Sequence, residues 1–249
     1  MTTAQKDSSA AAPKDAVGAL FSVGAHFGYS KSRRHPSMKE LIFGTKDRVE
    51  IFDLEKTNVL LDEALAYVRS LGAEGKTLLF VGSKPEAVNA VKNGAGEINM
   101  PFVAGRWLGG TLSNFPEIKK RIARLAELTA DRESGALLKK YTKKERLLID
   151  REITKLERNF GGISSLTRVP DALFIVDSKH ESIAVAEARG LKVPIIALVN
   201  SDSNRGLVTY PMPGNDAALE SITFFVSKIV EAYKEGRKAG APIPAPKEG

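Results

Sequence analysis

The chain has 249 residues, enough for one large domain or for a domain with an appendage. Its net charge of +7, from 37 Lys and Arg against 30 Asp and Glu, suggests an anionic partner. The absence of cysteine excludes disulfides and thiolate metal sites and suits a reducing compartment. No apolar run approaches the length of a membrane span, so we expect a cytoplasmic protein with no membrane partner.

The N-terminal region predicts a tail, a short helix and a basic loop. Residues 1–14 are mainly Ala, Ser, Thr and Pro and predict a disordered tail, because they offer little to bury. Asp15 then caps a short helix that carries the apolar residues of DAVGALFSVG. In the loop that follows, Lys31–Lys39 holds four Lys and Arg and no acidic residue.

From residue 48 onward, strand and helix patterns alternate. Apolar runs predict strands over 48–54, 77–83, 101–104, 172–177 and 194–200, with helices over 57–71, 85–98 and 180–189. Residues 208–212 predict a last edge strand, weakened by proline. Asn215 or Asp216 caps a final helix to about residue 233, and 236–249 predict a flexible tail. This alternation indicates an α/β fold: a parallel sheet with helices on both faces.

Residues 116–160 interrupt the alternation with two amphipathic helices and no strand. Apolar residues at coiled-coil spacing form a seam: Ile118, Ile122 and Leu125 in the first helix, and Ile149, Ile153, Leu156 and Phe160 in the second. Thr142 and Glu145 have the spacing of a capping box that opens the second helix. An 18-residue helix is about 27 Å long, so we expect this antiparallel hairpin to protrude from a body formed by 15–115 and 161–235.

The positive charge is concentrated in the loop and the hairpin. Residues 116–160 hold 13 Lys and Arg against 8 Asp and Glu, and with Lys31–Lys39 they leave the remainder of the chain slightly acidic. Two separate basic segments favour binding to a polyanion. The alternative is that the charged helix faces are merely solvated.

Pro101–Phe115 contains the only tryptophan, Trp107, close to Gly105, Gly109 and Gly110. Adjacent glycines permit positive φ and the close approach of another backbone. This stretch is either a docking or junction element or a tight turn that places one aromatic side chain in the core. Arg106 adds a guanidinium suited to phosphate or carboxylate.

No catalytic, metal or cofactor motif emerges from the sequence. VGSK before a helix resembles a phosphate-binding turn, but no GxGxxG or GxxxxGK[ST] is present, and no histidine has a partner at ligand spacing. Asp53, Asp171 and Asp177 lie near strand ends, where α/β enzymes keep carboxylates. Helix capping explains that placement equally well.

GRWLGGTLSNF resembles a motif of the bacterial-type S-two family of small-subunit ribosomal proteins. GAHFG, IFDLEKT, LFVGSK, PDALFIVD and PGNDAALESI resemble the same family in the same order, over about residues 16–235. The resemblance implies a flavodoxin-like, doubly wound sheet of five strands in the order two-one-three-four-five. It also implies binding to small-subunit ribosomal RNA where head and body meet, and attachment of ribosomal protein S-one. No homo-oligomer is expected.

The residues expected to contact RNA are basic or lie in the basic loop: Lys31, Arg33, Arg34, His35, Lys39 and Arg106, with Lys119, Lys120, Lys143 and Lys144 on the hairpin. The expected hairpin junction comprises Trp107, Gly109, Gly110, Gly161 and Gly162, with Trp107 packed at the hairpin root. Tyr29, His35 and Ser37 depart from the family pattern of histidine, tryptophan and lysine, which bears on individual contacts in the loop. The alternative function, an α/β nucleotide or phosphosugar enzyme, is supported by fold class alone.

Overall fold

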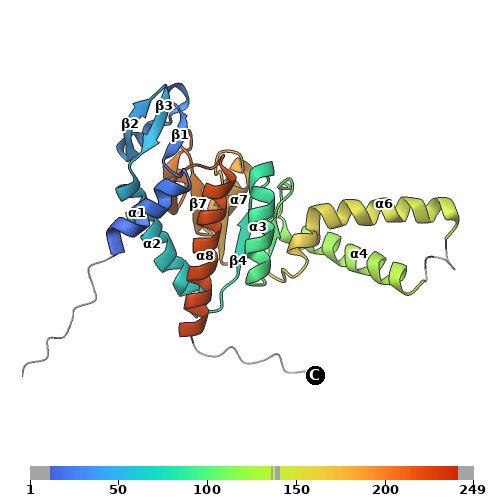
Figure 1. The fold of residues 1–249 in the computed structure, drawn as a ribbon. Coiled ribbons are helices and arrows are strands. Elements are labelled where there is room, and N and C mark those ends of the chain that lie inside the picture. Colours follow the sequence, from blue (N-terminus) through green and yellow to red (C-terminus); the bar gives the residue numbers. More distant parts are fainter. Residues whose placement is uncertain (1–11, 136, 138–140, 241–249) are drawn as a thin grey trace, which may run out of the picture.

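A parallel sheet of five strands forms the centre of the molecule (Figure 1). The computed structural model describes residues 12–135, 137 and 141–240. The strands are β4 (Leu78–Val81), β5 (Phe102–Val103), β6 (Ala172–Val176), β7 (Ile195–Val199) and β8 (Tyr210–Pro213). Their spatial order is β5-β4-β6-β7-β8, which is two-one-three-four-five along the chain. The expected flavodoxin-like order is confirmed.

Alternate residues of the central strands enter two separate cores, because successive side chains of a strand point to opposite faces. Leu78 and Phe80 of β4 join a core with helices α2 (Leu54–Ala73), α3 (Pro85–Glu97) and α8 (Leu219–Ala239). Leu79 and Val81 join a second core with α7 (Ser182–Gly190) and the root of the hairpin. Burial on both faces explains the unbroken apolar runs of these strands.

A second, antiparallel sheet of three strands lies at one end of the molecule, in the order β1-β3-β2. It consists of β1 (Phe27–Ser30), β2 (Ile42–Lys46) and β3 (Val49–Phe52), with the short helices η1 (Lys31–Arg33) and η2 (Pro36–Leu41) between β1 and β2. The strand predicted over 48–54 therefore belongs here and not to the alternating parallel set. Asp47 and Arg48 have φ of 50° and 67°, so a tight turn pairs β3 with its sequence neighbour β2.

The terminal helices are longer than the sequence predicts. Helix α1 (Ala12–Ser22) begins before Asp15, so the predicted tail is wrong for 12–14, and residues 1–11 lie outside the described part. Helix α8 runs to Ala239, so the predicted C-terminal tail is wrong for 236–239, and 241–249 also lie outside. Asn215 Oδ1 accepts the N–H groups of Ala217 and Ala218 ahead of α8 at 3.0 and 3.3 Å, whereas Asp216 is buried and caps nothing.

Helices α4 (Phe115–Glu133) and α6 (Lys143–Phe160) form the hairpin and project from the body (Figure 1). Leu125, Ile153 and Leu156 of the predicted apolar seam are buried in this exposed arm, together with Leu128, which the seam did not include, and they hold the two helices together. The predicted capping box of Thr142 and Glu145 is confirmed. Coiled-coil geometry of the pair stays a prediction. No described helix combines the length and apolar character needed to cross a membrane.

Glycines set the distance between α2 and α8. A Cβ at Gly236 of α8 would lie 2.0 Å from the carbonyl oxygen of Arg69, whereas one at Gly96 of α3 would have no atom within 4 Å. We expect Gly236→Ala to lower the free energy of unfolding by about 1–3 kcal/mol, because the helices must separate. Gly96→Ala should raise it by about 0.4–1 kcal/mol. Urea unfolding measures both, and equal midpoints for the two variants would contradict the close contact.

Candidate nucleic-acid interface

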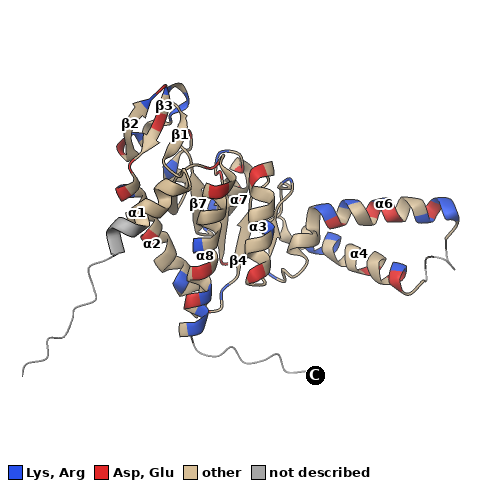
Figure 2. Ribbon diagram, in the orientation of Figure 1, with Lys and Arg blue, Asp and Glu red and all other residues tan. Residues whose placement is uncertain are grey.

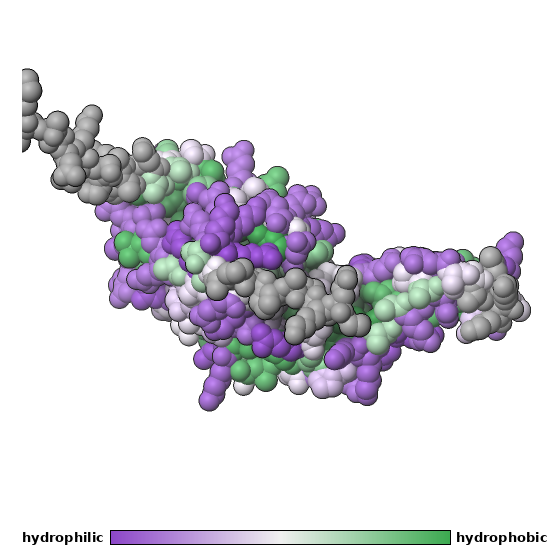
Figure 3. Space-filling model, turned by 90° about the horizontal axis from the view of Figure 1, so that it is seen from below, coloured by the Kyte–Doolittle hydropathy of each residue, from purple (hydrophilic) through white to green (hydrophobic). Residues whose placement is uncertain are grey.

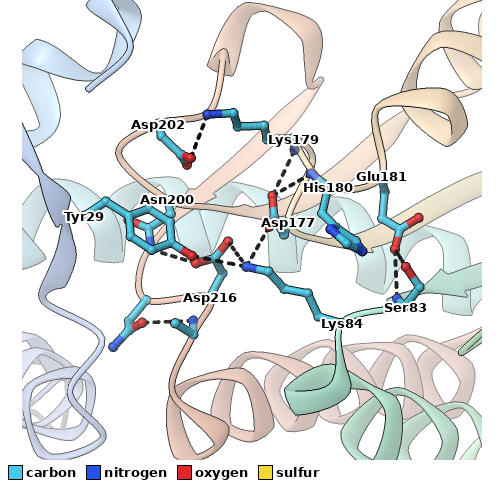
Figure 4. Close-up of polar contacts among 12 residues, drawn as sticks. Tyr29, Ser83, Lys84, Asp177, Lys179, His180, Glu181, Asn200, Asp202 and Asp216 are labelled. Atoms are coloured by element: carbon cyan, nitrogen blue, oxygen red, sulfur yellow. Dashed lines mark hydrogen bonds and ion pairs between the residues drawn. The ribbon is translucent and has the colours of Figure 1, made fainter. Parts of the chain in front are cut away.

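The carboxyl edge of the parallel sheet, where open α/β folds hold their ligands, is filled by a buried ion cluster (Figure 4). Lys84 follows β4, and its Nζ lies 2.6 Å from Asp177 Oδ2, just after β6, and 3.0 Å from Asp216 Oδ2, after β8. Lys84 Nζ also donates to the hydroxyl of Tyr29 on β1 at 3.3 Å. The Lys84 ammonium is thus paired within the protein rather than presented to a phosphate.

Further polar contacts hold this cluster in place. Asn200, after β7, donates its Nδ2–H to Asp216 Oδ1 at 2.6 Å, and Asp177 Oδ1 accepts the backbone N–H groups of Lys179 and His180 at 3.0 and 2.9 Å. Ser83 donates its backbone N–H to Glu181 at 2.8 Å, and its hydroxyl bonds to the same carboxylate. Every strand end from β4, β6, β7 and β8 therefore contributes a group to one network.

The protonation of the cluster follows from burial and charge. Burial disfavours the Lys84 ammonium, but Asp216 and Asp177 outweigh it and raise the pKa of Lys84. Burial and the neighbouring Asp177 raise the pKa of Asp216 to about 6. For Asp177, burial is outweighed by hydrogen bonds from Lys84 and His180, and its pKa is lowered. As the pH falls, Asp216 therefore takes up a proton before Asp177 does, and the ion pair between Asp177 and Lys84 persists.

The glycine-rich turn is organised around one carboxylate. Glu187 on α7 accepts the backbone N–H groups of Gly110, Leu112 and Ser113 at 2.7, 2.9 and 3.0 Å. It also accepts from Trp107 Nε1 at 3.2 Å and from the Ser113 hydroxyl at 3.1 Å. Trp107 is 4% exposed and belongs to the core at the hairpin root. The stretch is thus a tight turn that places the tryptophan in the core, and it also lies at the junction with the hairpin.

The four junction glycines differ in what their backbones require. Gly110 has a φ of 91°, which a side chain disfavours, and a Cβ at Gly162 would lie 2.3 Å from the Phe102 carbonyl oxygen. Gly109 and Gly161 have no atom within 4 Å of such a Cβ. Gly162 therefore brings the end of the hairpin directly against β5, while Gly109 and Gly161 meet no such restriction.

The basic loop is anchored at some residues and exposed at others. Lys31, Arg33 and Lys39 are exposed, but Arg34 Nη1 lies 3.1 Å from Oε1 of the fully buried Glu50. The backbone N–H of His35 donates to Ser201 O at 2.8 Å. Arg34 and His35 thus attach the loop to the body, and the three exposed cations face solvent.

The three departures from the family pattern all make internal contacts. Tyr29 accepts from Lys84, and His35 Nδ1 lies 2.8 Å from Ser37 Oγ. Ser37 Oγ in turn accepts the backbone N–H of Arg205 at 3.2 Å. These three side chains are thus held by contacts within the protein rather than left as unpaired groups at the surface.

The remaining candidates form a second set, away from the loop. Lys119, Lys143, Lys144 and Arg106 are exposed, and Lys120 Nζ lies 2.6 Å from Glu117 at the surface. Figure 2 shows these hairpin charges at the opposite end of the molecule from the three-stranded sheet. In Figure 3 a pale green strip runs along the hairpin between hydrophilic margins. The structure therefore separates the predicted RNA contacts into a loop set and a hairpin set.

Several charged residues that shape these sites were missed from the sequence. Lys84 lies in the VGSK turn, which matches no phosphate-binding motif, and Glu187 lies in an ordinary helix pattern, so neither residue gives a signal in the sequence. Asp53 caps α2 by accepting from Glu55 and Lys56, which matches the capping interpretation. Among the described residues, no three His, Asp or Glu side chains converge to hold a metal ion.

Comparison with known proteins identifies the relatives of this chain. The family model described as ribosomal protein S2 matches residues 20–236. The small ribosomal subunit protein uS2 of Corynebacterium urealyticum is 43% identical over 222 residues, which cover 89% of this chain and 82% of that protein. The uS2 proteins of Wolinella succinogenes (43% over 218 residues, covering 88% and 80%) and Acidothermus cellulolyticus (41% over 238 residues, covering 92% and 86%) are also similar. These relatives are named as proteins of the small ribosomal subunit, which weighs against the enzyme alternative.

Removing the central ammonium of the edge cluster should destabilise the fold. Lys84→Met leaves Asp177 and Asp216 buried without their cation, and we expect it to lower the free energy of unfolding by about 3–5 kcal/mol. The matched control, Lys234→Met, breaks an exposed pair with Glu97 at 2.7 Å and should cost less than about 1 kcal/mol. Denaturant unfolding at neutral pH measures both, and similar losses for the two variants would contradict a structural role for the cluster.

The Glu187 carboxylate should contribute stability that depends on pH. Burial opposes its charge, but hydrogen bonds from Ser113, Leu112, Gly110 and Trp107 outweigh burial and lower its pKa. Because the folded pKa is depressed, this stability is present above the ordinary glutamate pKa and is lost as pH falls through the lowered one. Glu187→Gln should therefore destabilise at neutral pH by about 2 kcal/mol, with the difference from wild type shrinking in acid. Thermal unfolding measures the stability difference between Glu187→Gln and wild type. If that difference stayed constant down to low pH, the prediction would be refuted.

Proposed function

The chain belongs to the ribosomal protein S2 family, and on that premise we propose that it holds ribosomal RNA through the exposed cations of its loop and hairpin. It is a structural, non-catalytic constituent of the small ribosomal subunit. The observation that carries the RNA proposal is the division of its cations. The Lys84 ammonium is paired with carboxylates inside the protein, whereas Lys31, Arg33 and Lys39 face solvent.

This division suits recognition of a folded polyanion. Exposed lysine and arginine neutralise phosphates and release counterions, which gives affinity that falls steeply with salt. A-form RNA is read mainly by shape and backbone contacts, for which distributed cations suffice. The loop and the hairpin lie far apart on the molecule, so two separate RNA segments can be held at once.

On the basis of the family resemblance, we extend the proposal to the location of the protein and to its binding partners. The protein acts on the cytoplasmic ribosome, contacts RNA where the head and body of the small subunit meet, and supports the attachment of ribosomal protein S-one. Its other partners are the neighbouring small-subunit proteins. The two-set arrangement of cations supports a position between two parts of an RNA structure.

Charge reversal in the loop should weaken assembly without unfolding the protein. Lys31→Glu with Arg33→Glu changes two exposed cations and avoids Arg34, whose reversal would place a second carboxylate against buried Glu50. We expect reduced co-sedimentation with small subunits that lack this protein, a salt-dependence slope smaller by about 2, and an unchanged melting temperature. S-one content of the reconstituted subunits should fall with occupancy.

The matched control reverses two exposed cations at the far end of α8, Arg237→Glu with Lys238→Glu, and makes the same change in net charge. It should leave occupancy close to wild type. Equal occupancy for both double variants would remove the loop from the RNA interface. If the reconstituted small subunits held this protein at full occupancy but bound no S-one, the attachment proposal alone would be refuted.

A further inference from the structure

We propose that a hollow beside the basic loop receives one unstacked base of the bound RNA, with guanine preferred. The hollow has a volume of about 310 Å³ and lies between α7 and the segments that follow β6 and β7. The residues that line it include His35 of the basic loop, and also Lys179, Arg189 and Asp202. This inference rests on the proposed RNA-binding function and assigns a specific contact to it.

One stripe of α7 forms a wall of the hollow. Ser182, Val185, Ala186 and Arg189 line it, and their spacing of three, one and three places them on the same helix face. Val185 and Ala186 provide an apolar surface, and the half-exposed Leu207 lines the hollow from the η4 turn (Arg205–Leu207). Apolar walls with a few fixed polar groups are typical of a site for a flat, partly polar ligand.

Asp202 brings an unused hydrogen-bond acceptor to this site. Its side chain is only 10% exposed; Oδ2 pairs with Lys179 Nζ at 2.9 Å, and Oδ1 is buried with no hydrogen-bond partner in the described structure (Figure 4). A buried carboxylate oxygen without a donor is unfavourable. Lys179 is 58% exposed, and its ammonium has this one partner among the described residues. Movement of Lys179 toward an RNA phosphate would therefore free Asp202 Oδ2, with which it pairs, for a donor from the ligand.

The chemistry of the bases decides which one this acceptor prefers. Guanine carries two adjacent N–H donors, at N1 and N2, on its Watson–Crick edge, which suits a carboxylate, whereas cytosine and adenine offer one amino donor beside an acceptor nitrogen. The N3–H of uracil lies between two carbonyl oxygens, which a carboxylate repels. Arg189, which is exposed and lines the hollow, and the exposed cations of the loop would hold the phosphates on either side of an inserted base. The hollow thus adds base preference to an interface otherwise based on backbone charge.

The test compares two hexanucleotides, UUGUUU and UUUUUU, binding to the ¹⁵N-labelled full chain by NMR titration at constant salt. We expect the guanine oligomer to bind about tenfold more tightly and to shift the amide signals of Lys179, Ser203 and Asn204. Asp202→Asn should abolish the guanine preference while leaving the uridine affinity and its salt dependence nearly unchanged. The control Asp62→Asn removes an exposed carboxylate on α2 and should keep the preference.

Equal affinities with unmoved signals around the hollow would overturn this inference while leaving the RNA-binding function intact. If charge reversal in the loop left subunit assembly unchanged, the proposed RNA-binding function itself would be overturned. The two failures are therefore distinguishable. A guanine preference that persists in Asp202→Asn would assign the selectivity to another group. If that variant fails to fold, the comparison of the two oligomers on the wild-type protein still decides.

Discussion

The placement of the Lys84 ammonium between Asp177 and Asp216 is the interaction on which the rest of the structure depends. It joins the ends of β4, β6 and β8, and through Tyr29 it fastens the three-stranded sheet over the carboxyl edge. Breaking a buried ion pair by removing one partner is costly, because it leaves an uncompensated charge. The part of the carboxyl edge that lies around Lys84, where other proteins of this architecture hold ligands, is therefore occupied by structural contacts.

The exposed cations of the proposed RNA interface lie instead in the peripheral loop and hairpin. Contacts with a carboxylate hold each of these two elements in place. A carboxylate accepts donors from each: the buried Glu50 from Arg34 in the loop, and the partly buried Glu187 from the turn that leads into the hairpin. Each carboxylate gains charge-assisted hydrogen bonds and fixes an otherwise irregular segment. The exposed cations next to these anchors are thus presented by ordered backbone, which lowers the entropic cost of binding.

The sequence predicted features that depend on local pattern. The buried strands followed from apolar runs, the capping box from Thr142 and Glu145, and the sheet order from family resemblance. Contacts between distant segments left no such signal: Lys84 and Asp216 are 132 residues apart, and Glu187 and Leu112 are 75 apart. Arg33 and Arg34 look equivalent in sequence, yet only Arg34 meets Glu50, because that depends on how β3 pairs. Strand pairing and buried charge compensation are tertiary properties that propensity and spacing do not encode.

Helix α7 shows how one short element can serve both the hairpin root and the surface. Glu187 holds the Trp107 turn, and the stripe from Ser182 to Arg189 borders the hollow next to the basic loop. Phosphate contacts fix the register of an RNA without reading its sequence. An interface made only of exposed lysine and arginine would therefore accept any RNA of suitable shape. Asp202 lines that hollow, and the base contact proposed for its carboxylate would make the affinity depend on base identity as well.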